Sequence, residues 1–277
     1  MSRRLVRLVT PTLLSVTPIL LSVTVVSLTV ILSSAAPAAA APAVDYVALG
    51  DSYSAGVGAA GSTGLCLRSP NGYPQLWDRR NDPASFRSVA CAGAETDDVL
   101  LWQVPFLRSG TDLVSITIGG NDAGFASAVI SCTLGSDSAC AQRVATARGY
   151  IAATLPGRLD ETYRAIRRRA PTAQVVVLSY PRLFDVTAAN CGAGGMSLAK
   201  RRVLNAGADD LDEVIRARSA AAGFTFADVR DEFDGHGICS AAPWLNGLTV
   251  IPPTYSWHPN ATGYARGYLP ALSGAVD

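Results

Sequence analysis

Five short runs of aliphatic, β-branched and aromatic residues alternate with segments in which apolar residues recur at helical spacing. The runs are VDYVALG (44–50), FRSVA (86–90), TDLVSITIGG (111–120), AQVVVLSYP (173–181) and FTFADV (224–229). Several are almost continuous in apolar character, as expected of strands that are buried on both faces of a parallel sheet. The alternation predicts an α/β fold, a three-layer α/β/α sandwich around a mainly parallel sheet.

The segments between these runs are typical of helices. Residues 73–80 and 95–104 are short, whereas 141–169 repeat apolar residues every three or four positions. Residues 197–222 do the same, with Ser197 as a candidate N-cap and Gly223 near the end. Ligands of open parallel sheets bind at the carboxyl ends of strands, so polar residues that follow a predicted strand are the candidates for function.

Residues 1–43 are typical of a secretory signal peptide. Arg3, Arg4 and Arg7 precede an apolar core, which ends in the small residues SSAAPAAAAPA. A membrane anchor is the alternative, because the core is longer than the usual ~7–15 residues, but no stop-transfer charges follow it. We expect cleavage after Ala40 or Ala43, secretion to the extracellular medium, and one domain over residues 44–277.

The charge balance excludes an electrostatic nucleic-acid-binding surface. Without the three arginines of the signal segment, 20 basic and 22 acidic residues remain, so the net charge is −2. The sequence has two histidines and no C-x-x-C pair, which argues against a metal site, and we expect no cofactor. Six cysteines follow residue 44, and an even number in an exported chain predicts three disulfides whose pairing stays open.

The stretch ALGDSYSAGVGAAG (48–61) supports two different functions. Its second half has the letters G-x-G-x-x-G of a dinucleotide-binding loop. That motif requires its glycines directly after the strand and at the start of a helix, but residues 51–55 intervene and no helical pattern follows. We therefore expect the glycines to form a flexible surface loop, and the serine in the first half becomes the candidate.

Ser52 has potential partners at equivalent places along the chain. Gly93 follows the second predicted strand, Asn121 follows the third, and His258 lies in SWHPN near the end. Each has an ordinary alternative role: Gly93 as a turn, Asn121 as a helix cap and His258 as a surface residue. Together they supply a nucleophile, amide donors and a base, which is the set that acyl transfer needs.

Four short blocks carry a resemblance to a known family. GDSYS, AGAET, GGNDAGF and SWHPN resemble the conserved blocks of the SGNH (GDSL) hydrolase superfamily, in particular its secreted actinomycete lipase and phospholipase A1-type branch. The resemblance extends from about Tyr46 to Leu272. It implies a five-stranded flavodoxin-like sheet and hydrolysis of carboxylic esters.

The resemblance also implies individual roles. Ser52 is expected to be the nucleophile and His258 the base, with an oxyanion hole formed by the backbone N–H groups of Ser52 and Gly93 and the side-chain amide of Asn121. The same branch pairs its six cysteines in sequence order. The expected disulfides are Cys66–Cys91, Cys132–Cys140 and Cys191–Cys239.

The sequence departs from the family at one position. Many members carry Asp three residues before the histidine, where this chain has Tyr255, and no Asp or Glu lies between Asp234 and His258. We therefore expect a Ser52–His258 dyad in which the carbonyl of Ser256 orients the imidazole, and a His258 pKa not raised much above the ordinary ~6.5. Asp51 is expected to anchor the turn, and His236 to be structural.

The substrate stays open at this level. A lipase, a phospholipase A1, a short-chain esterase and a carbohydrate deacetylase are all compatible with these blocks, and the alternative outside catalysis is a binding protein on an inactive scaffold. The segment APWLNGLTVIPPTY (242–255) is equally consistent with an acyl-binding wall and with ordinary core. We expect a monomer that acts on small or lipid esters, binds no nucleic acid, and contacts lipid surfaces at most transiently.

Overall fold

A five-stranded sheet forms the centre of the fold in the computed structural model, which describes residues 44–191 and 196–276. The strand order is β2-β1-β3-β4-β5 and every neighbouring pair is parallel, which is the flavodoxin-like order. The predicted fold class is therefore confirmed. The strands are β1 (Asp45–Gly50), β2 (Ser85–Ser88), β3 (Leu113–Thr117), β4 (Gln174–Leu178) and β5 (Thr225–Ala227). The expected signal peptide lies outside the described residues.

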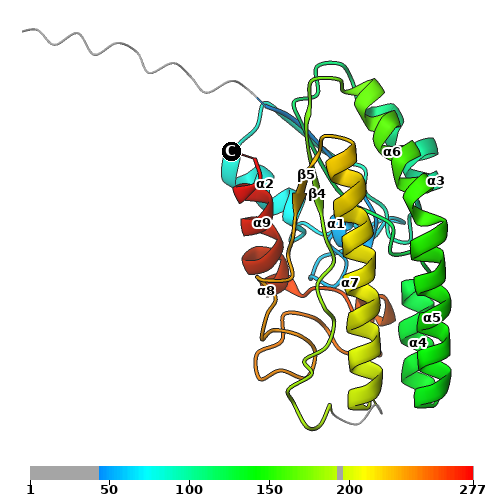
Figure 1. The fold of residues 1–277 in the computed structure, drawn as a ribbon. Coiled ribbons are helices and arrows are strands. Elements are labelled where there is room, and N and C mark those ends of the chain that lie inside the picture. The colour runs from blue at the N-terminus through cyan, green and yellow to red at the C-terminus, as the bar shows by residue number, and fades with distance from the viewer. Residues whose placement is uncertain (1–43, 192–195, 277) are drawn as a thin grey trace, which may run out of the picture. The chain divides into compact units, whose positions relative to one another are not determined.

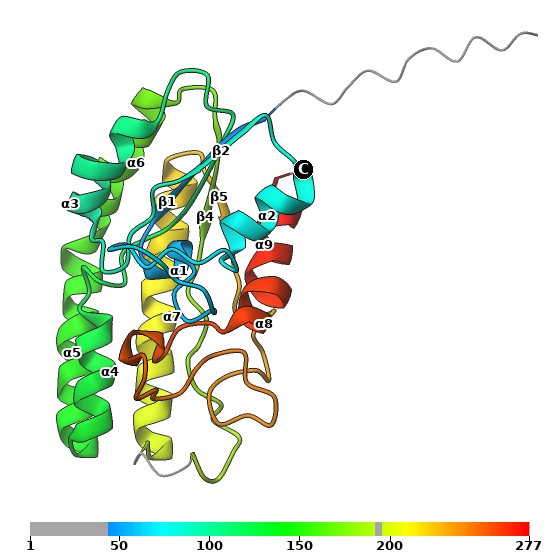
Figure 2. The same cartoon turned by 180° about the vertical axis from the view of Figure 1, so that it is seen from behind.

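Helices cover both faces of this sheet (Figures 1 and 2). α2 (Tyr73–Asn81) and α9 (Leu269–Gly274) pack on one face, and α6 (Leu155–Arg169) and α7 (Leu198–Ala221) on the other. All five residues of β3 are buried, and so are the last five of β1. The nearly continuous apolar runs therefore correspond to strands covered on two sides.

The helices differ from the sequence expectation in two respects. The single pattern over 141–169 forms α5 (Asp137–Ala153) and α6, which meet at Thr154. Pro156 explains the break, because its ring cannot continue the hydrogen bonding of a preceding helix. The sequence reading also missed α4 (Phe125–Leu134), which directly follows the Asn121 block.

The other elements are short and lie in the connections. They are α1 (Ser52–Ala55), α3 (Thr96–Asp98), a π-helical turn (Val99–Gln103), a 3₁₀ turn (Val104–Phe106), a second 3₁₀ turn (Pro253–Tyr255), α8 (Ala261–Gly263) and a second π-helical turn (Tyr264–Tyr268).

The cysteines are joined in sequence order. Cys66–Cys91 connects the loop after α1 with the segment after β2, Cys132–Cys140 connects α4 with α5, and Cys191–Cys239 connects two long loops. Over the described ranges, no helix has the length and apolar character that crossing a membrane requires.

Candidate active site

Ser52 lies at the carboxyl end of β1, as the first residue of α1. The chain turns sharply at Gly50, whose φ is +118° and where a Cβ atom would lie 2.4 Å from the carbonyl oxygen of Thr117. Only glycine fits this close approach between β1 and β3. The turn delivers Ser52 to the edge of the sheet where sites of this fold form.

Asp51 anchors that turn, as expected. Its backbone N–H donates to the carbonyl of Thr117 (3.0 Å), and its carboxylate accepts from the N–H of Tyr53 (2.9 Å) and from the hydroxyl of Tyr180. Burial raises the pKa of Asp51 from 3.8 to about 7, although both hydrogen bonds oppose the shift. The carboxylate therefore fixes the backbone beside Ser52.

His258 reaches Ser52 from the other end of the chain. Its Nε2 lies 2.8 Å from Oγ of Ser52, and its Nδ1 lies 2.9 Å from the carbonyl oxygen of Ser256. With Nδ1 protonated, the carbonyl accepts that proton's hydrogen bond and Nε2 is left free to accept from the serine. The geometry matches the expected dyad, in which main chain takes the place of the carboxylate.

The surroundings of His258 keep it neutral. Removal from water lowers the pKa of His258 from 6.5 to about 4, while hydrogen bonds to the carbonyls of Ser256 and Thr254 oppose the shift. The ring is partly exposed, so contact with water reduces the size of this shift but not its direction. Residues 235–265 contain no Asp, Glu, Lys or Arg, so the segment around His258 carries no permanent charge. The sequence had predicted only that this pKa would not rise much.

The glycine-rich stretch supports His258 and is not a surface loop. Residues 56–59 are buried, so the expectation of a flexible surface loop is wrong. At Gly58, with φ +96°, a Cβ atom would lie 2.7 Å from Cβ of His258 and 2.5 Å from the carbonyl oxygen of Pro259. Glycine is required there because the loop packs directly against the histidine.

Two side chains missed by sequence reasoning hold the His258 segment. The amide of Asn246 donates to the carbonyls of Gly58 (3.0 Å) and His258 (3.2 Å), and the hydroxyl of Tyr53 donates to the carbonyl of Trp257 (2.8 Å). Tyr53 is adjacent to Ser52 in the GDSYS block, so the sequence did offer a reason to consider it as a site residue. Asn246 has no comparable sequence signal.

Asn121 lines the same pocket as Ser52 and His258. One N–H of its side-chain amide donates to the carbonyl of Ala94 (2.9 Å), which leaves the second for another acceptor. Gly93, with φ +82°, precedes Ala94, and nearby Cys91 donates its N–H to the carbonyl of Gly50 (3.0 Å). The Gly93 segment therefore runs between the end of β1 and Asn121.

Asp122 joins the Asn121 block to the segment after Gly93. Its carboxylate accepts hydrogen bonds from the N–H (3.1 Å) and the hydroxyl (2.5 Å) of Thr96. Burial raises the pKa of Asp122. Sequence reasoning missed this pair, although Asp122 directly follows Asn121.

Asp228, an acidic residue that precedes His258 in the sequence, is engaged elsewhere. Asp228 forms an ion pair with Arg230 and also accepts from the hydroxyl of Ser179 (3.3 Å).

His236 stacks on Trp244 with ring centroids 3.8 Å apart, and its Nδ1 lies 2.8 Å from the carbonyl oxygen of Ala242. His236 is therefore part of the loop structure, as expected. Within the described ranges, no cluster of three His, Cys, Asp or Glu side chains is arranged to hold a metal ion.

Three hollows lie at or near these groups. The serine pocket, of about 50 Å³, contains Ser52, Asn121 and His258, with walls from α4 and Trp257. The Leu248 hollow, of about 370 Å³, shares Trp257 with it and has no charged lining residue. The Trp102 hollow, of about 520 Å³, is lined by Cys66, Arg68, Val89, Cys91, Ala92, Gly93, Ala94, Asp98, Trp102, Gln103 and Phe106.

The segment 242–255 lies partly in the core and partly along a hollow. Leu245 is buried in the core, whereas Leu248 and Val250 line the Leu248 hollow. Leu248, Val250 and Ile251 are 61%, 83% and 90% exposed, which makes this edge of the site apolar.

Comparisons with known proteins agree with this geometry. Residues 48–266 match the model of the GDSL-like Lipase/Acylhydrolase family. A lipase of Streptomyces rimosus is 51% identical over 251 residues, which cover 88% of this chain and 92% of the relative. The crystal structure of an extracellular lipase of the same species is similar with a TM-score of 0.81 and 52% identity, over 84% of this chain and all of that one. A phospholipase A1 from Streptomyces albidoflavus has a TM-score of 0.82 and 47% identity, over 84% of this chain and 99% of its own.

Proposed function

The chain belongs to the GDSL-like lipase/acylhydrolase family and is an ester hydrolase, and on this premise we propose that Ser52 and His258 catalyse its reaction as a dyad. The observation that carries the proposal is the hydrogen-bonded chain from Oγ of Ser52 through the imidazole of His258 to the carbonyl of Ser256. Such a chain fixes both the tautomer and the direction of the base.

The reaction has two symmetrical halves. Nε2 of His258 accepts the hydroxyl proton of Ser52 while Oγ attacks the ester carbonyl, and the tetrahedral oxyanion is bound by the N–H groups of Ser52 and Gly93 and the amide of Asn121. The C–O bond to the alcohol then breaks, and His258 returns its proton to the leaving oxygen. Water repeats both steps on the acyl-enzyme, which releases the carboxylic acid and restores Ser52.

The uncharged carbonyl of Ser256 is a suitable hydrogen-bond acceptor for His258, because this base stays unprotonated at neutral pH. The low pKa of His258 keeps Nε2 available as an acceptor at neutral pH. The carbonyl of Ser256 stabilises the imidazolium in the transition state less than a carboxylate would. The desolvated site compensates, because oxyanion donors act more strongly where water is excluded.

The setting of the enzyme is part of the same proposal. Residues 1–43 act as a signal peptide, residues 44–277 form a single secreted domain, and the enzyme works as a monomer on lipid esters. Support comes from the extracellular lipase of Streptomyces rimosus and from the three disulfides, which persist in oxidising surroundings. The exposed Leu248, Val250 and Ile251 favour a transient contact with lipid surfaces.

Replacement of the nucleophile tests the mechanism. Ser52→Ala should fold normally and lose nearly all hydrolysis of p-nitrophenyl butyrate, and a fluorophosphonate should label Ser52 alone in the unmodified enzyme. Ser62→Ala is the matched control, because Ser62 lies in the same loop region and donates only to the carbonyl of Ala59 (3.4 Å). Labelling of another serine, or an active Ser52→Ala variant, would refute the dyad.

A further inference from the structure

The Trp102 hollow adjoins the serine pocket through a shared strip of backbone. Gly93 and Ala94 line the hollow, and the carbonyl of Ala94 accepts from Asn121, which lines the serine pocket. Gln103 forms another part of the lining, and its side chain bonds the N–H (2.7 Å) and the carbonyl (2.9 Å) of Gly50, two residues before Ser52. The Trp102 hollow therefore lies against the backbone strip that contains Gly93, a proposed oxyanion donor.

The serine pocket is small compared with the Trp102 hollow. Small-molecule sites usually measure roughly 300–1,000 Å³. The serine pocket, at about 50 Å³, has room for only a few atoms around the reacting carbonyl, whereas the Trp102 hollow, at about 520 Å³, lies within the usual range.

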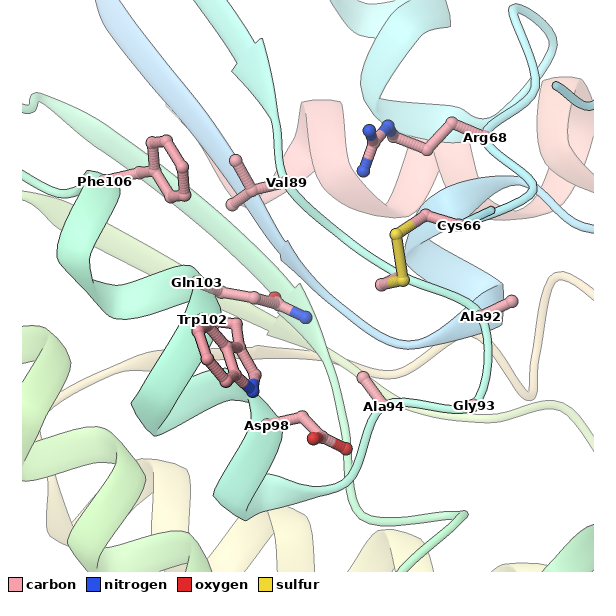
Figure 3. Close-up of a pocket in the computed structure, with 11 residues that line it drawn as sticks. Cys66, Arg68, Val89, Ala92, Gly93, Ala94, Asp98, Trp102, Gln103 and Phe106 are labelled. Atoms are coloured by element: carbon pink, nitrogen blue, oxygen red, sulfur yellow. A yellow bond between two sulfur atoms is a disulfide. The ribbon is translucent and has the colours of Figure 1, made fainter. Parts of the chain in front are cut away.

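Two opposite charges face the Trp102 hollow without pairing. Arg68 donates from Nη1 to the carbonyl of Ala90 (3.0 Å), and Asp98 accepts at Oδ2 from the N–H of Glu95 (3.0 Å). Across residues 44–191 and 196–276, neither side chain takes part in an ion pair. Figure 3 shows them on opposite sides of the hollow. This separation suits a ligand that carries both charges itself.

An aromatic surface accompanies the carboxylate. Asp98, Trp102 and Phe106 follow one another at intervals of four residues, and all three line the hollow. Trp102 is 71% exposed, and Figure 3 places its indole beside the carboxylate of Asp98. An aromatic face next to a carboxylate is a typical recognition site for quaternary ammonium groups, which cannot donate N–H hydrogen bonds.

We propose that the Trp102 hollow binds the phosphocholine head group of a glycerophospholipid whose ester reacts at Ser52. The trimethylammonium group contacts Trp102 and Asp98, and the phosphate contacts the guanidinium of Arg68, a group suited to phosphate oxygens. The inference rests on the proposed function and names its substrate class. The uncharged Leu248 hollow, on the side of Trp257, leaves the apolar end of such a lipid a separate place.

Head-group selectivity tests this assignment. The substrates are mixed micelles of phosphatidylcholine or phosphatidylglycerol with identical acyl chains, and the variants are Asp98→Asn, Trp102→Ala and Arg68→Gln. Asparagine keeps a side-chain oxygen for the N–H of Glu95, so Asp98→Asn removes the charge with little change to the helix start.

The first two variants should lower the ratio of kcat/KM on phosphatidylcholine to that on phosphatidylglycerol by about threefold to thirtyfold, the range expected for loss of a cation–π or charge contact. Arg68→Gln should lower kcat/KM on both lipids, since both carry the phosphate, and should change the ratio less. Leu101→Ala is the control, because Leu101 is exposed beside Trp102 but does not line the hollow.

An unchanged ratio in Asp98→Asn and Trp102→Ala would overturn the head-group site, as would a wild-type enzyme that hydrolyses neither phospholipid. Failure of the dyad is a separate result, because it appears as p-nitrophenyl butyrate hydrolysis that persists in Ser52→Ala. An enzyme that needs Ser52 for butyrate but does not distinguish the two head groups would keep the dyad and exclude the head-group site.

Discussion

The two members of the proposed dyad are positioned by different kinds of structure. Ser52 follows β1, whose register with β3 pairs Gly50 with Thr117, so the sheet itself sets its place. His258 lies between β5 and α8, in a long segment whose regular structure is limited to the 3₁₀ turn Pro253–Tyr255. Side-chain hydrogen bonds from Asn246 and Tyr53 hold that segment. The position of Ser52 therefore depends on the register of the sheet, whereas the position of His258 depends on a few hydrogen bonds between loops.

Among the variants that compare these two regions, the largest effect is expected at Asn121, which follows β3 of the sheet. Asn121→Ala should lower kcat by ~10²–10³ with little change in folding, because it removes one donor from the developing oxyanion. Steady-state kinetics on p-nitrophenyl butyrate, with circular dichroism as a check on folding, measure this. A loss of only twofold would remove Asn121 from the oxyanion hole.

The next effect is expected on the histidine side, at Gly58. Gly58→Ala should lower kcat by about 10²-fold, because the new methyl group displaces His258 and small misplacements of catalytic groups are costly. Gly64→Ala is the matched control, since Gly64 also has a positive φ (+69°) but a Cβ there meets nothing within 4 Å. Equal losses in both variants would indicate general backbone strain rather than displacement of His258.

Removing one side-chain amide from each region compares directly how Ser52 and His258 are held in place. Gln103→Ala leaves the buried N–H of Gly50 without its acceptor, whereas the Gly50 carbonyl keeps the N–H of Cys91. Asn246→Ala leaves the Gly58 carbonyl without its donor, whereas the His258 carbonyl keeps the backbone N–H of residue 246. Each unsatisfied buried group costs about 1–3 kcal/mol. We expect Gln103→Ala to lower the free energy of unfolding more than kcat, and Asn246→Ala to do the reverse. Urea unfolding and steady-state kinetics on both variants measure these losses. If both variants lose unfolding free energy and kcat in the same proportion, the two regions are not positioned in different ways.

The smallest expected effect concerns the pH dependence of stability. His258 and Asp51 contribute to the free energy of unfolding with opposite dependence on pH. His258 binds its proton less readily in the folded protein, so its share of stability is lost as pH falls from about 6.5 towards 4. Asp51 holds its proton more tightly when folded, so its share is lost as pH rises from 3.8 towards 7. The two contributions therefore act in opposite directions between pH 4 and pH 6.5.

Asp51→Asn should expose the contribution of His258, because asparagine keeps the N-cap but does not titrate. Its free energy of unfolding should fall more steeply than that of the wild type between pH 6.5 and pH 4.5. Wild-type kcat/KM should rise with pH through a midpoint below 6.5 and stay level into the alkaline range. Parallel stability curves for the two proteins, or an activity midpoint above 7, would contradict the assigned shifts.

The sequence predicted those parts of the site that follow strands or lie in family blocks. Ser52, Gly93 and Asn121 come after strands, and the parallel sheet brings them to one edge. Ser256 was predicted because Tyr255 removes the usual carboxylate, which leaves main chain as the nearest acceptor. The strand order was implied by the family resemblance and not by the alternation itself.

The remaining features depend on contacts between distant segments. Asn246 lies 188 residues from Gly58 along the chain, and Gln103 lies 53 residues from Gly50, so no local pattern reports either contact. The glycine-rich stretch was misjudged for the same reason, because its composition suits an exposed loop but His258 packs on it. The break at Pro156 was a local signal that the regular apolar spacing of 141–169 concealed.

The uncharged segment 235–265 has a consequence for how the enzyme responds to salt. Mobile ions change a pKa by screening neighbouring charges over ~8–10 Å at ordinary ionic strength. The pKa of His258 is set by loss of water and by two carbonyl groups, and no charged neighbour contributes to it. The pH range over which His258 stays neutral should therefore be nearly the same in dilute and in saline solution.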